Sequence, residues 1–278
     1  MRALSAFLRL RESFIGMLGF GIVLFWLLVA VFADIVAPFD PLQQISPMAP
    51  PGTSAEGGVL YLGADFLGRD ILSRIVHGTR TIMLWAPLAT ASAFLVGIFL
   101  GLVGGYYGGR IDDAISFVAN MILAFPVLVV LILIIGILGQ SGASIVAAIT
   151  FASSPAVFRI VRGEVLTIRN RDFIAAAKTR GESVLYILFV EILPNAKAPL
   201  IVDACLRMGY TTILIGILGL LGLGLPPPTP DWGGMVNENR VMALTFPHMT
   251  IFPCLAISSL VLGLNLLADG ISEINKRV

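Results

Sequence analysis

Six apolar runs, each long enough to cross a lipid bilayer, constrain the fold of this chain most strongly. A transmembrane helix needs about 20 mostly apolar residues to span a hydrocarbon core roughly 30 Å thick. The runs are residues 14–37, 82–105, 111–139, 143–161, 200–225 and 246–267. The chain is 57% hydrophobic and only 13% charged, whereas soluble domains carry about a quarter charged residues. The sequence therefore predicts an all-α transmembrane protein with six spans.

The first run could also be the apolar region of a cleaved signal peptide, because Arg2, Arg9 and Arg11 precede it. Such a region is about 7 to 15 residues long. The uninterrupted apolar stretch from Phe14 is longer than that. We therefore expect a retained first span at 14–37, preceded by a short N-terminal segment at 1–13.

The positions of the basic residues predict how the spans are oriented. If the N-terminus lies inside, the outside segments carry only Arg69, Arg74, Arg80 and Arg240, and most other Lys and Arg residues fall inside. Inside segments of membrane proteins are enriched in Lys and Arg. Both termini and the polar interruption at 162–197 are therefore predicted to be cytoplasmic, in a multi-pass membrane protein.

The polar interruption at 162–197 reads as two short helices joined by a turn. Asn170 or Asp172 is expected to cap the first helix with its side-chain oxygen. The run of alanines at 175–177 favours helix, and Gly181 can adopt the positive φ that ends it.

The second helix of this hairpin is expected to begin at Ser183, whose hydroxyl can cap it, and to stop at Pro194. A plain connector between two spans would be shorter and less patterned. The hairpin therefore predicts a partner outside the membrane.

The predicted outside segment, 38–80, begins with a proline-rich stretch that forbids regular structure. From Asp70 onward, apolar residues follow helical spacing and polar residues occupy the opposite face. This pattern predicts an amphipathic helix in the outer membrane interface that leads into the second span. The expected polar face consists of Arg69, Ser73, Arg74 and His77.

Two patterns inside the spans leave alternatives open. Gly97, Gly101 and Gly105 form a small-residue face, which suits close helix packing either within the chain or between subunits. Asp203 and Arg207 lie four residues apart on one helical face. They form either a structural ion pair or part of a transport pathway.

The sequence lacks motifs for catalysis, for metal binding and for a phosphate-binding loop. It has no Gly-x4-Gly-Lys-Ser/Thr, Gly-x-Ser-x-Gly or His-Glu-x-x-His pattern. His77 and His248 are isolated, and Cys205 and Cys254 have no neighbours at metal-ligand spacing. We therefore expect a non-catalytic subunit without a metal or cofactor of its own and without a nucleic-acid partner. If the protein moves a solute uphill, another chain would have to supply the energy.

Three motifs resemble those of ABC importer permeases, in particular the second permease of dipeptide, oligopeptide and nickel importers. The hairpin is similar to the EAA loop, and Ala175 and Glu191 depart from that pattern. The positions in register are Ala176, Ala177, Gly181, Leu193 and Pro194. The second motif is Leu-Gly-Ala-Asp-Phe-Leu-Gly-Arg-Asp at 62–70, and the third comprises 223–233 and 265–270.

The resemblance implies a permease core at 81–278, in a bacterial inner membrane. The partners that it implies are a homologous second permease, two cytoplasmic ATP-binding subunits that hold ATP and Mg²⁺, and an extracytoplasmic solute-binding protein. It also implies that residues 172–180 are the coupling helix that contacts an ATP-binding subunit. The implied coupling residues are Arg171, Asp172, Ala176, Ala177, Lys178, Arg180 and Gly181. The outer signature residues are Asp65, Gly68, Arg69, Asp70, Ser73 and Arg74.

Two other classes of membrane protein were weighed. A self-contained channel or secondary transporter would need internal repeats, broken helices or a proton-relay acid in a span. A structural or assembly protein would not need the patterned hairpin. The substrate stays open: peptides are favoured, and nickel chelates, opines and peptide-like antibiotics are alternatives.

Overall fold

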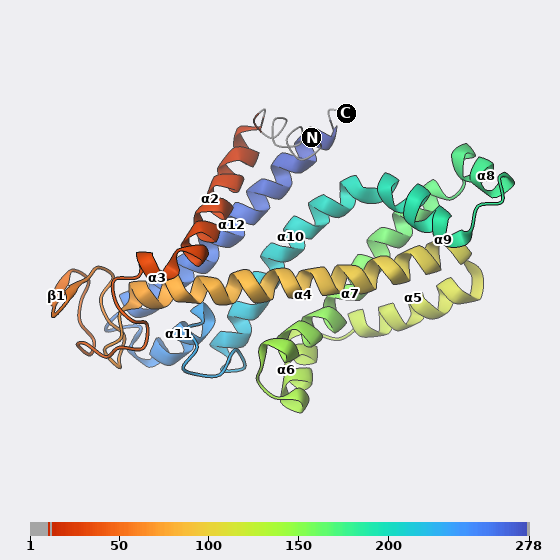
Figure 1. Cartoon of the computed structure of the whole chain (residues 1–278). Coiled ribbons are helices and arrows are strands. Elements are labelled where there is room, and N and C mark those ends of the chain that lie inside the picture. The colour runs from red at the N-terminus through yellow and green to blue at the C-terminus, as the bar shows by residue number, and fades with distance from the viewer. Residues whose placement is uncertain (1–10, 12, 277–278) are drawn as a thin grey trace.

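The protein folds into long helices with a small irregular region at one end (Figure 1). The computed structural model describes residue 11 and residues 13–276, so most of the predicted N-terminal segment lies outside the described residues. The helices are α2 (Phe14–Val31), α3 (Ala33–Val36), α4 (Ile71–Tyr107), α5 (Gly109–Leu123), α6 (Val127–Leu138), α7 (Gly142–Ile168), α8 (Asp172–Thr179), α9 (Val184–Tyr186), α10 (Leu193–Leu220), α11 (Trp232–Asn239) and α12 (His248–Lys276). Two short strands, β1 (Thr53–Ala55) and β2 (Gly58–Leu60), pair antiparallel.

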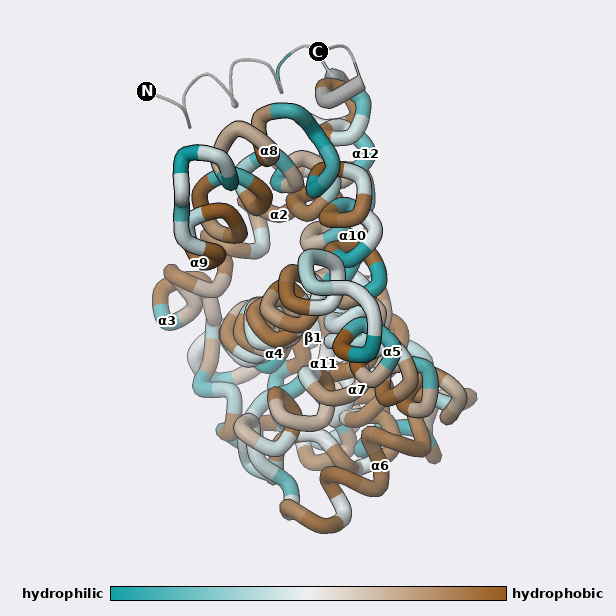
Figure 2. The backbone as a smooth tube through the Cα atoms, turned by 90° about the vertical axis from the view of Figure 1, so that its right-hand side faces the viewer, coloured by the Kyte–Doolittle hydropathy of each residue, from teal (hydrophilic) through white to brown (hydrophobic). Residues whose placement is uncertain are grey.

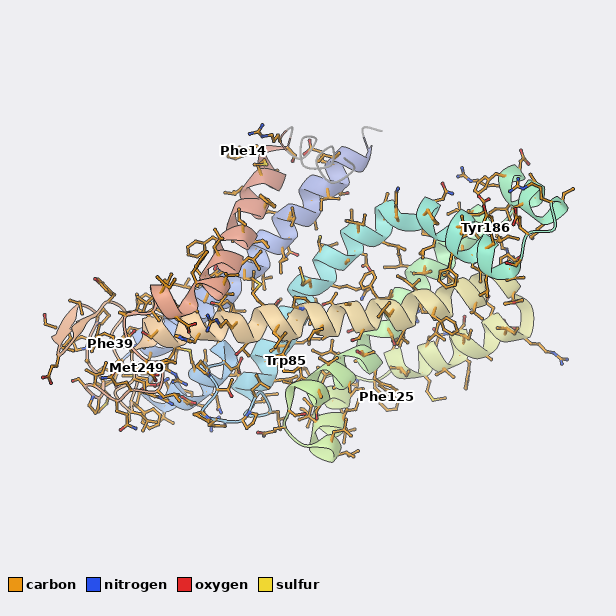
Figure 3. The ribbon with its side chains drawn as sticks, in the orientation of Figure 1. Phe14, Phe39, Trp85, Phe125, Tyr186 and Met249 are labelled. Atoms are coloured by element: carbon orange, nitrogen blue, oxygen red, sulfur yellow. The ribbon has the colours of Figure 1, made fainter. Side chains whose placement is uncertain are left out.

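Within the described residues, five helical segments are long and apolar enough to cross a membrane, and a sixth crossing requires α5 and α6 together. The predicted span at 111–139 is formed by two helices and not by one, because α5 and α6 meet at a 90° bend. Pro126 lacks an N–H group and disfavours helical backbone in the residue before it. Figure 3 shows Phe125 at this bend.

The second span begins earlier than predicted, because α4 is one helix of 37 residues starting at Ile71. Asp70 caps it by accepting a hydrogen bond from the backbone N–H of Ser73. The predicted helix from residue 70 onward is confirmed, but it is continuous with the span. Its expected polar face is also wrong, since Ser73 and Arg74 are buried against the rest of the protein.

The small-residue face of α4 packs within the chain, against α7. A Cβ added to Gly97 or Gly101 would lie 2.5 Å from the Cβ of Val157 or Val161, respectively. The same relation holds one turn further along, where Gly105 faces the Cβ of Val165 at 2.7 Å. The glycines therefore allow the two helix backbones to approach closely over three turns.

Helices α2 and α12 form a second close pair (Figure 1). A Cβ on Gly19 would collide with the backbone of α12, and one on Gly270 would collide with Gly16. The indole N–H of Trp26 also donates a hydrogen bond to the Ser259 hydroxyl at 3.0 Å. The first span is therefore fixed to the last one.

We name the two ends of the molecule by the motifs that they contain. The signature end contains β1, β2, α3, α11 and the start of α4, and Figure 3 places Phe39 and Met249 there. The hairpin end contains α8 and α9, with Tyr186 nearby (Figure 3). Figure 2 shows hydrophilic residues gathered around α8, whereas α4 and α6 are mostly hydrophobic.

Candidate functional site: the coupling hairpin and the signature cluster

Helix α8 forms the short helix predicted in the hairpin, with different capping at its start. Its N-cap is Arg171, and neither Asn170 nor Asp172 provides a side-chain cap. Asp172 instead lies in the first turn, where a negative charge is favourable to the helix dipole. Gly181 has φ +78°, which confirms the predicted turn.

The second helix of the hairpin starts as predicted but does not stop at Pro194. The Ser183 hydroxyl accepts a hydrogen bond from the Tyr186 N–H at 3.2 Å. The helix then widens into π-helical turns at Ile187–Ile192 and continues into α10. The wider turns immediately precede Pro194, whose ring would clash with the carbonyl four residues back in a regular α-helix.

One face of α8 packs on the protein's own core. Ile174 and Ala177 are fully buried in a cluster that includes Val165 and Ile192. Ala175 and Ala176 are exposed, as are Arg171, Asp172, Lys178 and Arg180. Of the proposed coupling residues, Ala177 therefore anchors α8 and cannot reach a partner directly. The other face is free to contact one.

Charged side chains tie α8 to its neighbours. The Lys178 ammonium lies 5.3 Å from the centre of the Tyr106 ring, at the end of α4. Arg180 lies 3.5 Å from Glu182 and 3.4 Å from Glu191. Glu191, which departs from the EAA pattern, therefore bridges the two helices of the hairpin. Exposed pairs of this kind contribute about 1 kcal/mol or less.

At the signature end, Asp65 is the centre of a buried ionic cluster. Its Oδ1 accepts hydrogen bonds from the backbone N–H groups of Leu67 and Arg69, both at 2.9 Å. Its Oδ2 accepts from Arg69 Nε at 2.7 Å and from Arg74 Nη1 at 2.6 Å. Asp65 and Arg74 are at most 1% exposed. The sequence motif thus encodes a folded loop held on the first turn of α4.

Glu238 on α11 completes this cluster, and sequence analysis did not identify it. Its carboxylate accepts from Arg69 Nη2 at 2.5 Å and from Arg74 Nη1 at 2.8 Å. Burial alone would raise the pKa of Glu238, but the two guanidinium groups outweigh burial and lower it. No spacing rule links residues 164 or more positions apart, so the sequence carried no signal for this contact.

The remaining signature residues shape the same loop. Asp70 Oδ2 accepts from the Ser73 N–H and hydroxyl groups, at 2.7 and 2.6 Å. Burial raises the pKa of Asp70, although the bonds from Ser73 and Leu72 oppose this shift. Gly68 has φ +86°, which lets the loop turn back toward Arg69.

The third motif docks α11 on α4. The Trp232 indole N–H donates to the Ile75 carbonyl at 2.9 Å, and Trp232 is fully buried. A Cβ on Gly78 would lie 2.8 Å from the Trp232 ring, so the small residue creates room for it. Trp232 is therefore a core residue of the signature end.

Asp203 and Arg207 form their own ion pair on α10. Arg207 Nε lies 2.6 Å from Asp203 Oδ2. Asp203 also lines a cavity of about 490 Å³ together with Pro199, Leu206 and Ser272. The structure does not bring this pair to the hairpin contacts or to the signature cluster.

Both the sequence and the fold of this chain match those of known proteins. Residues 93–277 match the family model described as the binding-protein-dependent transport system inner membrane component. Residues 4–51 match the N-terminal transmembrane domain of oligopeptide transport permease C. The chain belongs to this permease family. It is thus a non-catalytic, multi-pass membrane subunit of an ABC importer in the bacterial inner membrane, and ATP hydrolysis resides in separate subunits.

Several curated permeases are similar over most of their length. The dipeptide transport permease DppC of Haemophilus influenzae is 36% identical, over 93% of this chain and 88% of that protein. The di/tripeptide permease DppC of Pseudomonas aeruginosa is 38% identical, over 91% and 86%. The glutathione permease GsiD of Pectobacterium atrosepticum is 39% identical, over 77% and 71%.

Solved structures support the fold alone. The MetNI methionine ABC transporter, in inward-facing conformations, matches with a TM-score of 0.60 at 16% identity, over 75% of this permease and 98% of that chain. An amino acid ABC transporter matches with a TM-score of 0.53 at 19% identity, over 74% and 95%. The bent pair α5 and α6 is a broken helix, a feature that we associated with secondary transporters. The family assignment shows that it occurs here in an ABC permease.

Proposed function

We propose that this permease forms, with a homologous second permease, the pathway for peptides or peptide-like solutes. A solute-binding protein delivers the substrate at the signature end, and two ATP-binding subunits, which hold ATP and Mg²⁺, act at the hairpin end. The peptide class is supported by the names of the relatives, which are permeases for dipeptides, di- and tripeptides and glutathione.

The observation that carries the coupling role is the two-sided packing of α8. Buried Ile174 and Ala177 fix one face to the core, while the charged face is exposed. A short helix held in this way moves together with α7, which precedes it, and with the π-helical turns on which it packs, which continue into α10. Closure of the ATP-binding subunits would therefore displace these two helices and change access to the pathway.

The test compares two glycine substitutions in the reconstituted importer. Gly181 and Gly52 both have positive φ, and neither has an atom within 4 Å of an added Cβ, so valine imposes similar backbone strain at both positions. Gly181→Val distorts the hairpin, and we expect at least a tenfold loss of ATP hydrolysis stimulated by the peptide-loaded binding protein. Gly52→Val strains the signature end and should retain most of this stimulation. Gly181→Asn should also retain it, because asparagine tolerates positive φ.

Two results would contradict the proposal. One is normal coupling in Gly181→Val. The other is transport of dialanine down its gradient by this chain alone, without the ATP-binding subunits. Uptake of dialanine, compared with a nickel–histidine chelate, tests the substrate class separately.

A further inference from the structure

A small polar cavity lies beside the signature cluster, between the end of α10 and the start of α11. Its volume is about 120 Å³. Its polar side chains are Gln140, Thr229, Asp231, Asn237 and Glu238. The two ionisable groups among the lining residues are both carboxylates, and none of the lining residues is basic.

Asp231, which lines this cavity, has a buried side-chain oxygen without a hydrogen-bond partner in the described structure. Its side chain is buried, with 3% of the residue exposed. Oδ2 accepts a hydrogen bond from the Gly234 N–H at 2.8 Å, whereas Oδ1 has no hydrogen-bond partner in the described structure. A Cβ on Gly224 would lie 3.0 Å from Oδ2, and one on Gly219 would collide with it. The glycines thus let the end of α10 hold this carboxylate in place.

The surrounding charges do not neutralise Asp231. Glu238 already contacts both guanidinium groups of the cluster, Arg69 and Arg74. Asp65 and Glu238 therefore share these two cations, and among the described residues neither Asp70 nor Asp231 forms a salt bridge with them. The carbonyl end of α10, which carries a partial negative charge, lies at the same place. Burial raises the pKa of Asp231 to about 6, and Glu238 adds to this effect while Arg74 opposes it.

We propose that this cavity binds a primary ammonium group, which in the assembled importer is the amino terminus of a peptide. The peptide part of this inference rests on the proposed function. An ammonium group has three N–H donors, and two acceptors without a donor in the described structure are Asp231 Oδ1 and the amide oxygen of Gln140. The Gln140 amide nitrogen is already used, donating to the Gly222 carbonyl at 2.7 Å.

The ligand set favours ammonium over a metal ion. No group of three or more His, Cys, Asp or Glu side chains that could hold a metal occurs in the described part of the chain. Hard divalent cations such as Ca²⁺ take six to eight oxygen ligands. The cavity has room for an aminomethyl group and excludes a whole peptide, so the remainder of the substrate would extend outside it.

Binding of methylammonium to the assembled importer in nanodiscs provides the direct test. Radiolabelled methylammonium is measured by equilibrium dialysis at pH 7.5, above the pKa of Asp231, in buffers free of primary amines. We expect saturable binding that weakens at least tenfold in Asp231→Asn, because asparagine keeps the helix cap but removes the charge. The matched control is Asp40→Asn, on a turn at the same end, where Asp40 accepts from the Leu42 N–H. This control should bind as the unsubstituted protein does.

A second pair of variants covers the case in which Asp231→Asn folds poorly. Thr229 is exposed at the cavity edge. Thr229→Lys brings a tethered ammonium to the cavity and should abolish methylammonium binding, whereas Thr229→Met, of similar length and without charge, should keep most of it. Absence of saturable binding, or equal binding by Thr229→Lys and Thr229→Met, would overturn the proposal. Displacement by Na⁺ or K⁺ as effective as by methylammonium would overturn the choice of ammonium.

Competition identifies the source of the ammonium group. Dialanine should displace the probe, and N-acetyl-dialanine should not. If neither displaces it, the ammonium site stands and its assignment to a peptide terminus is wrong. The measurement uses the resting complex without ATP. A negative result here therefore leaves the coupling test with Gly181→Val unaffected, and a failure of that test leaves methylammonium binding unaffected.

Discussion

Arg74 is the residue through which the signature end is held together. It is buried, it bonds two carboxylates from separate segments, and it lies on the first turn of α4. Removing one member of a buried ionic network leaves the others uncompensated, which costs more than the network itself contributes. The signature residues therefore act first as structural groups that place α11 and the loop at 62–70 against α4.

Arg74→Met should lower the free energy of unfolding by about 3 to 5 kcal/mol, because Asp65 and Glu238 lose a shared cation. Arg240→Met is the matched control, since Arg240 is exposed and donates only to Asn237. We expect it to stay within about 0.5 kcal/mol of the unsubstituted protein. Unfolding by SDS in mixed micelles, followed by tryptophan fluorescence, measures both. Equal effects would contradict the buried cluster.

Asp231 predicts a specific pH dependence. Its folded-state pKa of about 6 lies above the unfolded value of 3.8, so between these pH values only the folded state holds the proton. Its contribution to stability is therefore full below pH 3.8 and is lost as pH rises through 6. The loss is of the order of 3 kcal/mol. Asp231→Asn should remove this component, and we expect the stability difference between the two proteins to change between pH 4 and 7. A pH-independent difference would show that the carboxyl titrates normally.

At the scale of elements, the pairing of α4 with α7 determines how the membrane part is built. Gly97, Gly101 and Gly105 on α4 each meet a valine on α7, and a face of this kind has no space for a side chain. Small residues are common where transmembrane helices cross closely, because lipid supplies no hydrophobic driving force for helix association. The glycine pattern therefore marks a helix–helix contact within the chain, between α4 and α7. The other faces of α4 are left for partners.

Gly101→Ala should destabilise the protein by about 1 to 3 kcal/mol, because the added methyl overlaps Val161. Gly163→Ala, on α7 itself, has nothing within 4 Å of its added Cβ. It should be neutral or stabilise slightly through helix propensity. Val161→Ala combined with Gly101→Ala should recover part of the loss. The SDS unfolding assay applies here as well. No recovery in the double variant would argue against the close contact between α4 and α7.

At the scale of the whole molecule, the two ends have different proposed roles and different predicted locations. The hairpin end is predicted to face the cytoplasm and the signature end the outside, on the strength of the distribution of Lys and Arg. Ala175 and Glu56 are exposed residues at these respective ends. They can therefore report orientation without disturbing the core.

Single cysteines at these positions, in a background with Cys205 and Cys254 replaced by alanine, test the orientation. In right-side-out vesicles, a membrane-impermeant maleimide should label Glu56→Cys and spare Ala175→Cys. Inverted vesicles should give the opposite pattern. Labelling of both positions from one side would contradict the orientation inferred from the basic residues.

Much of this architecture could be predicted from local patterns. Apolar runs located the spans, and Gly181 and Ser183 marked the hairpin turn, because these features depend on neighbours in the sequence. The bend before Val127 was missed although Pro126 signalled it, since an apolar run alone does not show direction. Contacts such as Glu238 with Arg74, and the burial of Trp232, depend on how distant segments pack, and no local pattern records them. Likewise, no local pattern showed that the helix continues past Pro194.

The unbroken length of α4 has a mechanical consequence. At 1.5 Å per residue its 37 residues form a helix about 55 Å long. One end is fixed to the signature cluster by Arg74, and Tyr106 at the other end lies under Lys178 of α8. A displacement of the hairpin would therefore move α4 as a whole and, with it, the signature end on the opposite side of the membrane. The conformational change would then occur mainly in the contacts at the two ends of α4.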